Sequence, residues 1–234
     1  MNERSPISEN LARIQARIAE AAQRSGRAAG EVKLVAVTKY VDVDQVRELV
    51  DAGCHDLGEA RPQELWRKAQ AFSGQPIEWH LIGHLQRNKI ARTLPLVRLI
   101  HSGDSLRLIE AIDAEAARAG LAPVPLLLEV NVSGDTTKHG FKPDELPPLG
   151  EQLAALRFLE IRGLMCMAGR EGSSQDARRD FERLRLLRDR LRANWPDRLV
   201  LDELSMGMSG DFEAAVEEGA TIVRIGSLLF EQID

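Results

Sequence analysis

The chain has 234 residues, of which 44% are hydrophobic, so it is long enough to bury one sizeable core as a single domain. Its formal net charge is −5 and it has no basic stripe with interleaved aromatic residues, which argues against a nucleic-acid partner. No apolar run is long enough to span a bilayer, and residues 1–5 lack the apolar stretch of a secretory signal. We therefore expect a cytoplasmic protein without nucleic-acid or membrane partners.

The first predicted element is a helix that begins at Ser5-Pro6, since proline is favoured at the first helical position. Its apolar residues form one stripe, namely Ile7, Leu11, Ile14 and Ile18. A second amphipathic helix is expected in the arginine-dense stretch 178–198, where leucines recur at helical spacing among solvated charges.

Along the rest of the chain, apolar strand-like runs alternate with helical patterns. Strands are predicted at 32–38, 55–58, 77–82, 98–102, 124–132, 158–167, 203–207 and 221–226. Helices are expected between them, and Gly53, Gly120 and Gly219 each follow a helical stretch, as left-handed C-terminal glycines do. This alternation predicts an α/β fold, a single parallel (β/α)8 TIM barrel with an extra N-terminal helix that spans residues 1–234.

Two cysteines, Cys54 and Cys166, stand in different units without the spacing of metal ligands. Because cytosolic thiols are kept reduced, we predict two buried free thiols, with neither a disulfide nor a metal site.

The turns after the last two predicted strands are rich in small residues. In a parallel barrel these turns form the usual phosphate site, because small residues let backbone N–H groups approach the phosphate oxygens. The candidates are Ser205, Gly207, Met208, Ser209, Gly226 and Ser227. Asp211 would repel a phosphate close to it, so we favour the turn at Gly226 over the turn at Ser209, whose alternative role is the N-cap of the next helix.

Lys39 stands at the end of the apolar strand 32–38, in a chain where lysine is scarce compared with arginine. A lysine at the mouth of a barrel can act as a nucleophilic amine and form an imine with a carbonyl compound. An imine-forming lysine together with a phosphate cradle indicates pyridoxal 5'-phosphate (PLP) as the cofactor. The alternative is a strand-end lysine whose ammonium group merely reaches solvent.

Several separated motifs follow one another in an order typical of a known family. They are Val35 to Lys39, Leu57-Gly-Glu59, Trp79 to Gly83 with Leu85-Gln86 and Asn88-Lys89, Gly163-Leu-Met165, Ser205 to Ser209, and Arg224 to Ser227. On these motifs the chain resembles the pyridoxal phosphate homeostasis proteins (the YggS/PROSC group), whose barrel is similar to the N-terminal domain of alanine racemase. Two positions depart from the family pattern: Ala60 replaces a usual asparagine, and Glu231 replaces a common glycine.

The resemblance implies that PLP is held as an imine on Lys39 and that Arg224 faces the pyridine nitrogen. Because a guanidinium group does not release its proton, it would donate a hydrogen bond to this nitrogen and keep it unprotonated, which weakens the ring as an electron sink. The alternative for Arg224 is an ion pair at the barrel mouth with Glu203 or Glu59.

For other polar residues near strand ends, the sequence allows either a role at the binding pocket or a purely structural role. His80 and His84 could line the pocket or be structural histidines of the barrel. Asn131 and Lys138 flank a polar loop after the fifth strand, which could gate the site or be surface loop only.

The resemblance implies a PLP-binding protein of PLP homeostasis, which buffers the cofactor and delivers it, through transient contact with apo PLP enzymes, without turnover of its own. One argument from the residues agrees. Two-base racemisation on this scaffold uses a lysine and a tyrosine from a second domain, whereas we expect one domain here and the only tyrosine is Tyr40, beside Lys39. The alternative is a weak PLP-dependent amino-acid racemase or lyase with Lys39 as its base, and a third hypothesis is a PLP-free Schiff-base aldolase.

Overall fold

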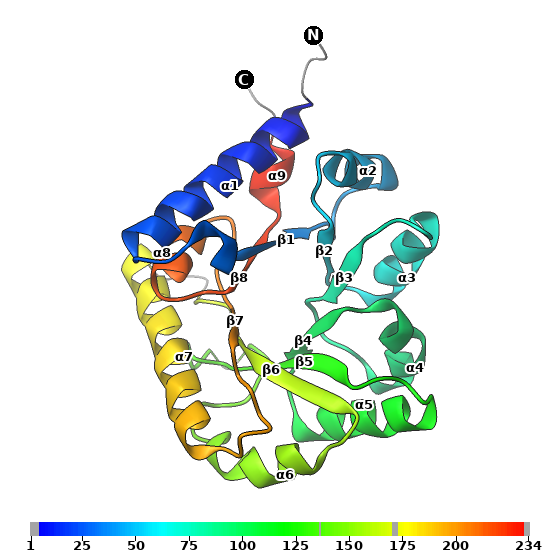
Figure 1. Ribbon diagram of the computed structural model, residues 1–234, viewed down its shortest axis with the longest axis vertical. Coiled ribbons are helices and arrows are strands. Elements are labelled where there is room, and N and C mark those ends of the chain that lie inside the picture. The colour runs from blue at the N-terminus through cyan, green and yellow to red at the C-terminus, as the bar shows by residue number, and fades with distance from the viewer. Residues whose placement is uncertain (1–4, 136, 170–172, 232–234) are drawn as a thin grey trace.

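Eight parallel strands close into a barrel with helices around it in the computed structural model of the protein (Figure 1). The structure describes residues 5–135, 137–169 and 173–231; Met1 to Arg4, part of the segment that argued against a secretory signal, lie outside the described residues. The strands pair in chain order, and β8 closes the barrel against β1 with Arg224 opposite Val35. The predicted parallel (β/α)8 barrel with an extra N-terminal helix is confirmed.

The strands are β1 (Lys33–Val37), β2 (Asp56–Glu59), β3 (Glu78–Leu81), β4 (Leu99–Gly103), β5 (Val124–Glu129), β6 (Leu159–Met165), β7 (Glu203–Ser205) and β8 (Ile222–Ile225). The helices are α1 (Pro6–Arg24), α2 (Val43–Asp51), α3 (Pro62–Ala71), α4 (Ile90–Thr93), α5 (Leu106–Arg118), α6 (Gly150–Ala155), α7 (Ser174–Asn194), α8 (Phe212–Glu217) and α9 (Ser227–Phe230). Every predicted strand is present, but β5, β6 and β7 end two or three residues early. In β7 the reason is the turn that follows, where Gly207 has a φ of 91°, outside the extended region.

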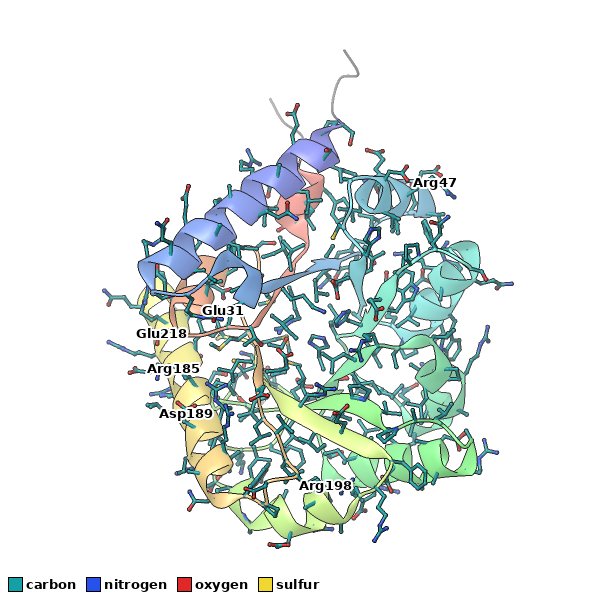
Figure 2. All side chains as sticks on the ribbon, viewed as in Figure 1. Glu31, Arg47, Arg185, Asp189, Arg198 and Glu218 are labelled. Carbon is teal, nitrogen blue, oxygen red and sulfur yellow. The ribbon has the colours of Figure 1, made fainter. Side chains whose placement is uncertain are left out.

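The two faces of the barrel wall bury different side chains, because alternate residues of a strand point inward and outward. In β1, Ala36 packs between the sheet and the helices, whereas Val35 belongs to an interior cluster with Leu99, Leu127, Met165 and Ile222. This cluster shares the interior with buried polar side chains, among them His80, His101, Ser205 and Arg224. Figure 2 shows side chains of the strands filling the enclosed space, while the labelled charged residues lie around the outside.

Gly163 in β6 occupies a place where no side chain fits. A Cβ atom there would lie 1.9 Å from the carbonyl oxygen of Glu203 on β7. The register between β5 and β6 also shifts here, between Leu126 and Leu127. The glycine of the motif Gly163-Leu-Met165 is therefore required by strand packing.

The N-terminal helix begins as predicted and covers the last part of the barrel. The Ser5 hydroxyl accepts a hydrogen bond from the Ser8 amide at 3.3 Å, and Pro6 occupies the first turn. The apolar stripe of α1 is buried, and the helix lies along α8 and α9 (Figure 1). The Asn10 side chain donates to the carbonyl of Glu231 at 2.8 Å, which ties the end of the described chain to α1.

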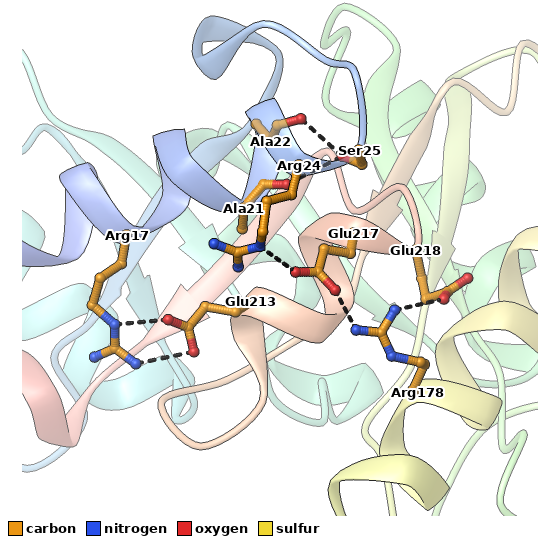
Figure 3. A network of polar contacts seen from close by, with 9 residues as sticks. All are labelled: Arg17, Ala21, Ala22, Arg24, Ser25, Arg178, Glu213, Glu217 and Glu218. Atoms are coloured by element: carbon orange, nitrogen blue, oxygen red, sulfur yellow. Dashed lines mark hydrogen bonds and ion pairs between the residues drawn. The ribbon is translucent and has the colours of Figure 1, made fainter.

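A chain of ion pairs joins α1 to α8 and α7 (Figure 3). Arg17 donates to both carboxylate oxygens of Glu213 at 2.9 and 3.1 Å. Arg24 pairs with Glu217, which also accepts from Arg178 of α7. Partly exposed pairs of this kind contribute about 0–1 kcal/mol each. The network helps hold α8, which connects β7 to β8, in place.

Several smaller predictions are also confirmed. Both cysteines are buried free thiols. Gly53, Gly120 and Gly219 have left-handed φ values of 89°, 63° and 99°. The arginine-rich helix α7 buries leucines at helical spacing, namely Leu184, Leu187 and Leu191. Within the described ranges, every helix is too short or too polar to cross a membrane.

Candidate functional site

A cavity of about 530 Å³ opens at the carboxyl ends of β1, β7 and β8. Its lining includes predicted site residues from all three strand ends, Lys39, Met208, Ser209, Arg224, Gly226 and Ser227. The remaining lining residues are Val37, Tyr40, Val41, Gly210 and Phe230. The volume lies in the range of ~300–1,000 Å³ that is typical of small-molecule sites, and the cavity lies at the end of the barrel where such sites occur.

The apolar run of β1 ends at the buried Thr38. The next residue, Lys39, lies exposed at the rim of the cavity. Its Nζ is 4.8 Å from the centre of the Tyr40 ring, a cation–π distance. The backbone before it is fixed by a buried ion pair, since Lys68 Nζ donates to the Thr38 carbonyl at 2.5 Å and to Glu59 Oε1 at 2.6 Å. The Thr38 hydroxyl donates to the same carboxylate oxygen at 2.6 Å. The buried ion pair thus anchors the segment that carries Lys39.

Arg224 is a buried cation that extends from β8 and is only 4% exposed. Its Nη1 donates to Ser205 Oγ at 2.6 Å, and its Nη2 donates to the Cys166 carbonyl at 2.9 Å. Burial lowers the pKa of Arg224, but from an ordinary value so high that the guanidinium group stays protonated. The alternative ion pairs are not formed among the described residues, because Glu59 binds Lys68 and Glu203 accepts a hydrogen bond from the Thr221 hydroxyl.

The turns after β7 and β8 are bonded to each other. Ser209 Oγ accepts a hydrogen bond from the Gly226 amide at 3.3 Å, and Asp211 Oδ1 accepts one from the Met208 amide at 2.6 Å. The alternative role of Ser209 as an N-cap is wrong, because α8 begins only after Asp211. A Cβ atom on Gly207 would lie 2.5 Å from an alanine methyl of α8, so this turn packs directly on the helix.

Ser205, like Gly207, is buried and, within the described part of the chain, is not one of the cavity's lining residues. Its Oγ is 2.8 Å from His101 Nδ1 on β4. His101 Nε2 lies 2.9 Å from His80 Nδ1, and His80 Nε2 lies 3.0 Å from Asp56 Oδ1. The Ser205 hydroxyl is thus in contact with His101 on one side and with the Arg224 guanidinium on the other, rather than with the cavity. The contacts of His80 place it in the barrel core.

A second polar group lies at the barrel mouth, at the ends of β3, β4 and β5. His84 Nδ1 is 2.7 Å from Asp104 Oδ2, and the His84 ring stacks on His139 with the centroids 5.2 Å apart. Burial, and then the charge of Asp104, raise the pKa of Glu129 to about 7, although Arg224 and His84 act in the opposite direction. His84 is exposed here and, among the described residues, is not part of the cavity lining.

The described residues of the loop after β5 are held by hydrogen bonds. Lys138 Nζ donates to the carbonyls of Met167 and Ala168 at 3.0 and 2.8 Å, and the Asn131 side chain donates to the Asp135 carbonyl at 2.7 Å. In the part of the chain that the structure describes, neither Lys138 nor Asn131 lines the cavity, so their contacts favour a structural role.

Ala60, which departs from the family pattern, lies against Gly83. A Cβ atom on Gly83 would be 2.3 Å from the Ala60 carbonyl oxygen. Within the described ranges Ala60 is not one of the lining residues, so the cavity is formed without it.

Some lining residues were missed although a sequence signal existed. Tyr40 and Val41 directly follow Lys39, Val37 lies two residues before it, and Gly210 follows Ser209. His101 and Glu129 carried no such signal, because neither belongs to a motif near Lys39, Ser209 or Arg224 in the sequence.

Comparisons with known proteins agree with this fold. Residues 10–232 match the family model described as alanine racemase, N-terminal domain. The chain is 41% identical over 222 residues to the pyridoxal phosphate homeostasis protein of Aquifex aeolicus, with 95% of this chain and 96% of that one covered. It is similar to PipY of Synechococcus elongatus, solved with PLP bound, with 34% identity, a TM-score of 0.85 and coverage of 96% of this chain and 100% of PipY. An alanine racemase of Clostridium difficile shares the fold at 16% identity and a TM-score of 0.74, over 97% of this chain and 56% of the racemase.

Proposed function

The chain belongs to the family of pyridoxal phosphate homeostasis proteins, and on this premise we propose that it binds PLP in the cavity at the ends of β1, β7 and β8. We propose further that it buffers the cofactor and delivers it without turnover. The observation that supports this most directly is the convergence of Lys39, Arg224 and the Gly226–Ser227 turn on one cavity.

The residues present fit each part of the cofactor. PLP carries an aldehyde, a pyridine nitrogen and a phosphate, and the cavity offers an exposed amine, a buried guanidinium group and small residues with backbone amides. The Ser227 amide has no hydrogen-bond partner within the described residues, so it remains available as a donor to a phosphate oxygen. When bound, PLP would supply an electrophilic carbonyl and an electron-withdrawing ring.

In this proposal Lys39 holds the cofactor covalently. Its amine, when unprotonated, would be the nucleophile that binds the aldehyde group, with release of water. Arg224 donates to the ring nitrogen, because a guanidinium group has donors only. Ser227 and the amides of the last two turns hold the phosphate, with Ser209 supporting the Gly226 end of the cradle.

The absence of turnover is part of the proposal, and two residues support it. A protonated Arg224 keeps the ring nitrogen unprotonated and so weakens its pull on electrons. Tyr40 is the only tyrosine of the sequence; it is 82% exposed and its ring contacts Lys39. It is therefore poorly placed to act as a second base on the opposite side of the ring.

Delivery would use the open rim of the cavity. Lys39 and Tyr40 are both exposed there, so a second protein could approach the amine that carries the cofactor. We propose transient contact with apo PLP enzymes at this rim, and the cytoplasmic location expected from the sequence remains a prediction.

The test is a spectrum and a map of the modified lysine. Purified protein reconstituted with PLP should be yellow, and borohydride reduction followed by peptide mass spectrometry should place the pyridoxyl group on Lys39. Lys39→Arg should abolish both signals, whereas the exposed-lysine control Lys142→Arg should retain them. A group found on another lysine would overturn the assignment of Lys39, and a colourless protein that does not bind PLP would favour a PLP-free enzyme.

A further inference from the structure

A line of polar side chains, all buried except the partly exposed Asp56 at its outer end, crosses the interior of the barrel from the amino ends of the strands to the guanidinium group at the cavity. It runs through Asp56 on β2, His80 on β3, His101 on β4 and Ser205 on β7 to Arg224 on β8. The successive contacts measure 3.0, 2.9, 2.8 and 2.6 Å. Both histidines and Ser205 are at most 1% exposed, so water does not substitute for these partners.

The two ends of this line have fixed hydrogen-bonding roles. Arg224 has donors only, so Ser205 Oγ must accept from it. At the other end burial acts to raise the pKa of Asp56, but hydrogen bonds from His80 and Lys33 outweigh burial and leave the pKa lowered. Asp56 is therefore an ionised acceptor, and His80 Nε2 must carry the hydrogen between them.

His101 in the middle is neutral. Burial first, and then the nearby cations Arg224 and Lys33, lower the pKa of His101 well below its ordinary value. A neutral imidazole has one donor and one acceptor nitrogen, so only two arrangements of the line are possible.

In the first arrangement His80 is neutral and its Nδ1 accepts a hydrogen bond from His101 Nε2. His101 Nδ1 is then an acceptor, and the Ser205 hydroxyl donates to it. Every donor meets an acceptor, and all the bonds run in one direction, from Arg224 to Asp56.

In the second arrangement His80 is a cation and donates to His101 Nε2, so His101 Nδ1 donates to Ser205. Ser205 Oγ then accepts from both neighbours, and its own hydrogen has no acceptor among the contacts of the described residues. Charges of both signs face His80. The carboxylate of Asp56 contacts it, and the small cavity that His80 lines also has three cations and one carboxylate, namely Lys33, Arg98, Arg162 and Glu203. The first arrangement is therefore favoured by hydrogen-bond satisfaction.

We infer that His101 and Ser205, oriented by His80 and Asp56, are positioning residues that hold Arg224 in the orientation from which it meets the cofactor ring. The line supports the guanidinium group from the side of the barrel core, while the Cys166 carbonyl holds its second nitrogen. This deepens the proposed function and rests on it for the link to PLP, but the direction of the hydrogen bonds is a property of the protein without cofactor.

The first experiment uses the apo protein with nitrogen-15-labelled histidine. Nuclear magnetic resonance near neutral pH should show His80 and His101 as neutral rings with hydrogen on Nε2 and none on Nδ1. Hydrogen on Nδ1 of His101, or a cationic His80, would overturn the one-directional chain. This outcome does not depend on PLP, so it separates failure of the inference from failure of the proposed function.

The second experiment breaks the line at two points and uses conservative partners as controls. Ser205→Ala and His101→Leu should each lower PLP affinity about tenfold, as expected for loss of a buried hydrogen-bond partner. Ser205→Thr keeps a hydroxyl, and His101→Gln keeps one donor and one acceptor, so both should retain most of the affinity. The double variant Ser205→Ala/His101→Leu should bind little worse than either single variant, because both act through the same contact to Arg224.

A spectroscopic readout separates positioning from general loosening of the core. With PLP labelled at its ring nitrogen, the nitrogen-15 shift should report an unprotonated nitrogen in the wild type and a larger protonated fraction in His101→Leu. Thermal unfolding of each apo variant checks that the barrel is folded. A folded His101→Leu variant with wild-type affinity and an unchanged nitrogen shift would overturn the inference.

Discussion

The hydroxyl of Ser209 accepts a hydrogen bond from the amide of Gly226 at 3.3 Å, so the turn after β7 is tied directly to the turn after β8. The two residues lie seventeen positions apart, on either side of α8. This bond and the Asp211 bond use the Gly226 and Met208 amides, whereas the amides of Ser209, Gly210 and Ser227 have no partner among the contacts of the described residues.

PLP binding should be sensitive to added bulk at the Gly226 turn. A Cβ atom on Gly226 would lie 3.4 Å from the Val37 Cβ, so the branched side chain of Gly226→Val must enter the cavity or displace Val37. We expect affinity for PLP to fall on the order of a hundredfold, as for an overpacked site. Gly210→Val is the matched control, since it also lines the cavity but its Cβ meets nothing within 4 Å. Equal affinity in Gly226→Val and wild type, measured by equilibrium titration, would contradict this placement.

Loss of the Ser227 hydroxyl should have a smaller effect. Ser227→Ala removes one side-chain hydrogen bond but keeps the backbone amide, so binding should weaken by about 1 kcal/mol. A titration of both proteins at matched ionic strength measures the difference. A loss as large as that in Gly226→Val would show that the side chain, rather than the backbone, holds the phosphate.

Arg224→Glu should change the electronic character of the bound ring. A carboxylate in place of the guanidinium group favours a protonated pyridine nitrogen, which raises the pKa of that nitrogen and strengthens the ring as an electron sink. We expect weaker PLP binding but faster exchange of amino-acid α-protons per bound cofactor.

The measurement compares absorbance against pH and exchange rates in deuterated water at matched occupancy. Arg224→Lys, which keeps a cation, serves as the control. If both observables match wild type in the Glu variant, Arg224 has only a structural role.

Catalysis by the wild-type protein should be absent or marginal, because Arg224 in the proposed contact would keep the ring nitrogen unprotonated and Tyr40 lies beside Lys39. The PLP-loaded protein would be incubated with L-alanine and L-serine in deuterated water, and α-proton exchange and racemisation followed by nuclear magnetic resonance and chiral chromatography. Rates on the order of 1 per second or faster are typical of enzymes and would support the racemase or lyase alternative.

Glu129 should make the folded protein less stable as pH rises. Its pKa is raised from the ordinary 4.5 to about 7, first by burial and then by Asp104, so the folded state holds the proton more tightly than the unfolded state. This contribution to stability is complete below the unfolded pKa and is lost as pH rises through about 7. A pKa of about 7 against the ordinary 4.5, at about 1.4 kcal/mol per pKa unit, makes the loss roughly 3.5 kcal/mol at most.

Glu129→Gln should remove this component of the pH dependence. Urea unfolding of the apo proteins at about pH 5 and pH 8 gives the free energies of unfolding. Relative to wild type, the variant should have a larger free energy of unfolding at the higher pH than at the lower pH. The exposed-residue control Glu48→Gln should leave the difference between the two pH values unchanged. The same difference in Glu129→Gln as in wild type would refute the assignment.

The sequence by itself determined the order of elements and much of the site. The alternation of apolar strands with amphipathic helices predicted the barrel, because burial on both faces of a parallel strand leaves a distinctive apolar run. Lys39 and Arg224 could be selected because each stands at the end of such a run, and the carboxyl ends of all barrel strands meet at one mouth.

Only the tertiary structure decided which polar groups touch. Barrel closure places β8 beside β1, and the inward alternation of β2, β3, β4 and β7 then brings residues as distant as His101 and Ser205 within 2.8 Å. Ser205 thus contacts Arg224 instead of facing the cavity, and Ser209 binds Gly226 instead of capping α8. A motif fixes which residues stand near a strand end, but strand register and the inward or outward direction of each side chain decide its partner.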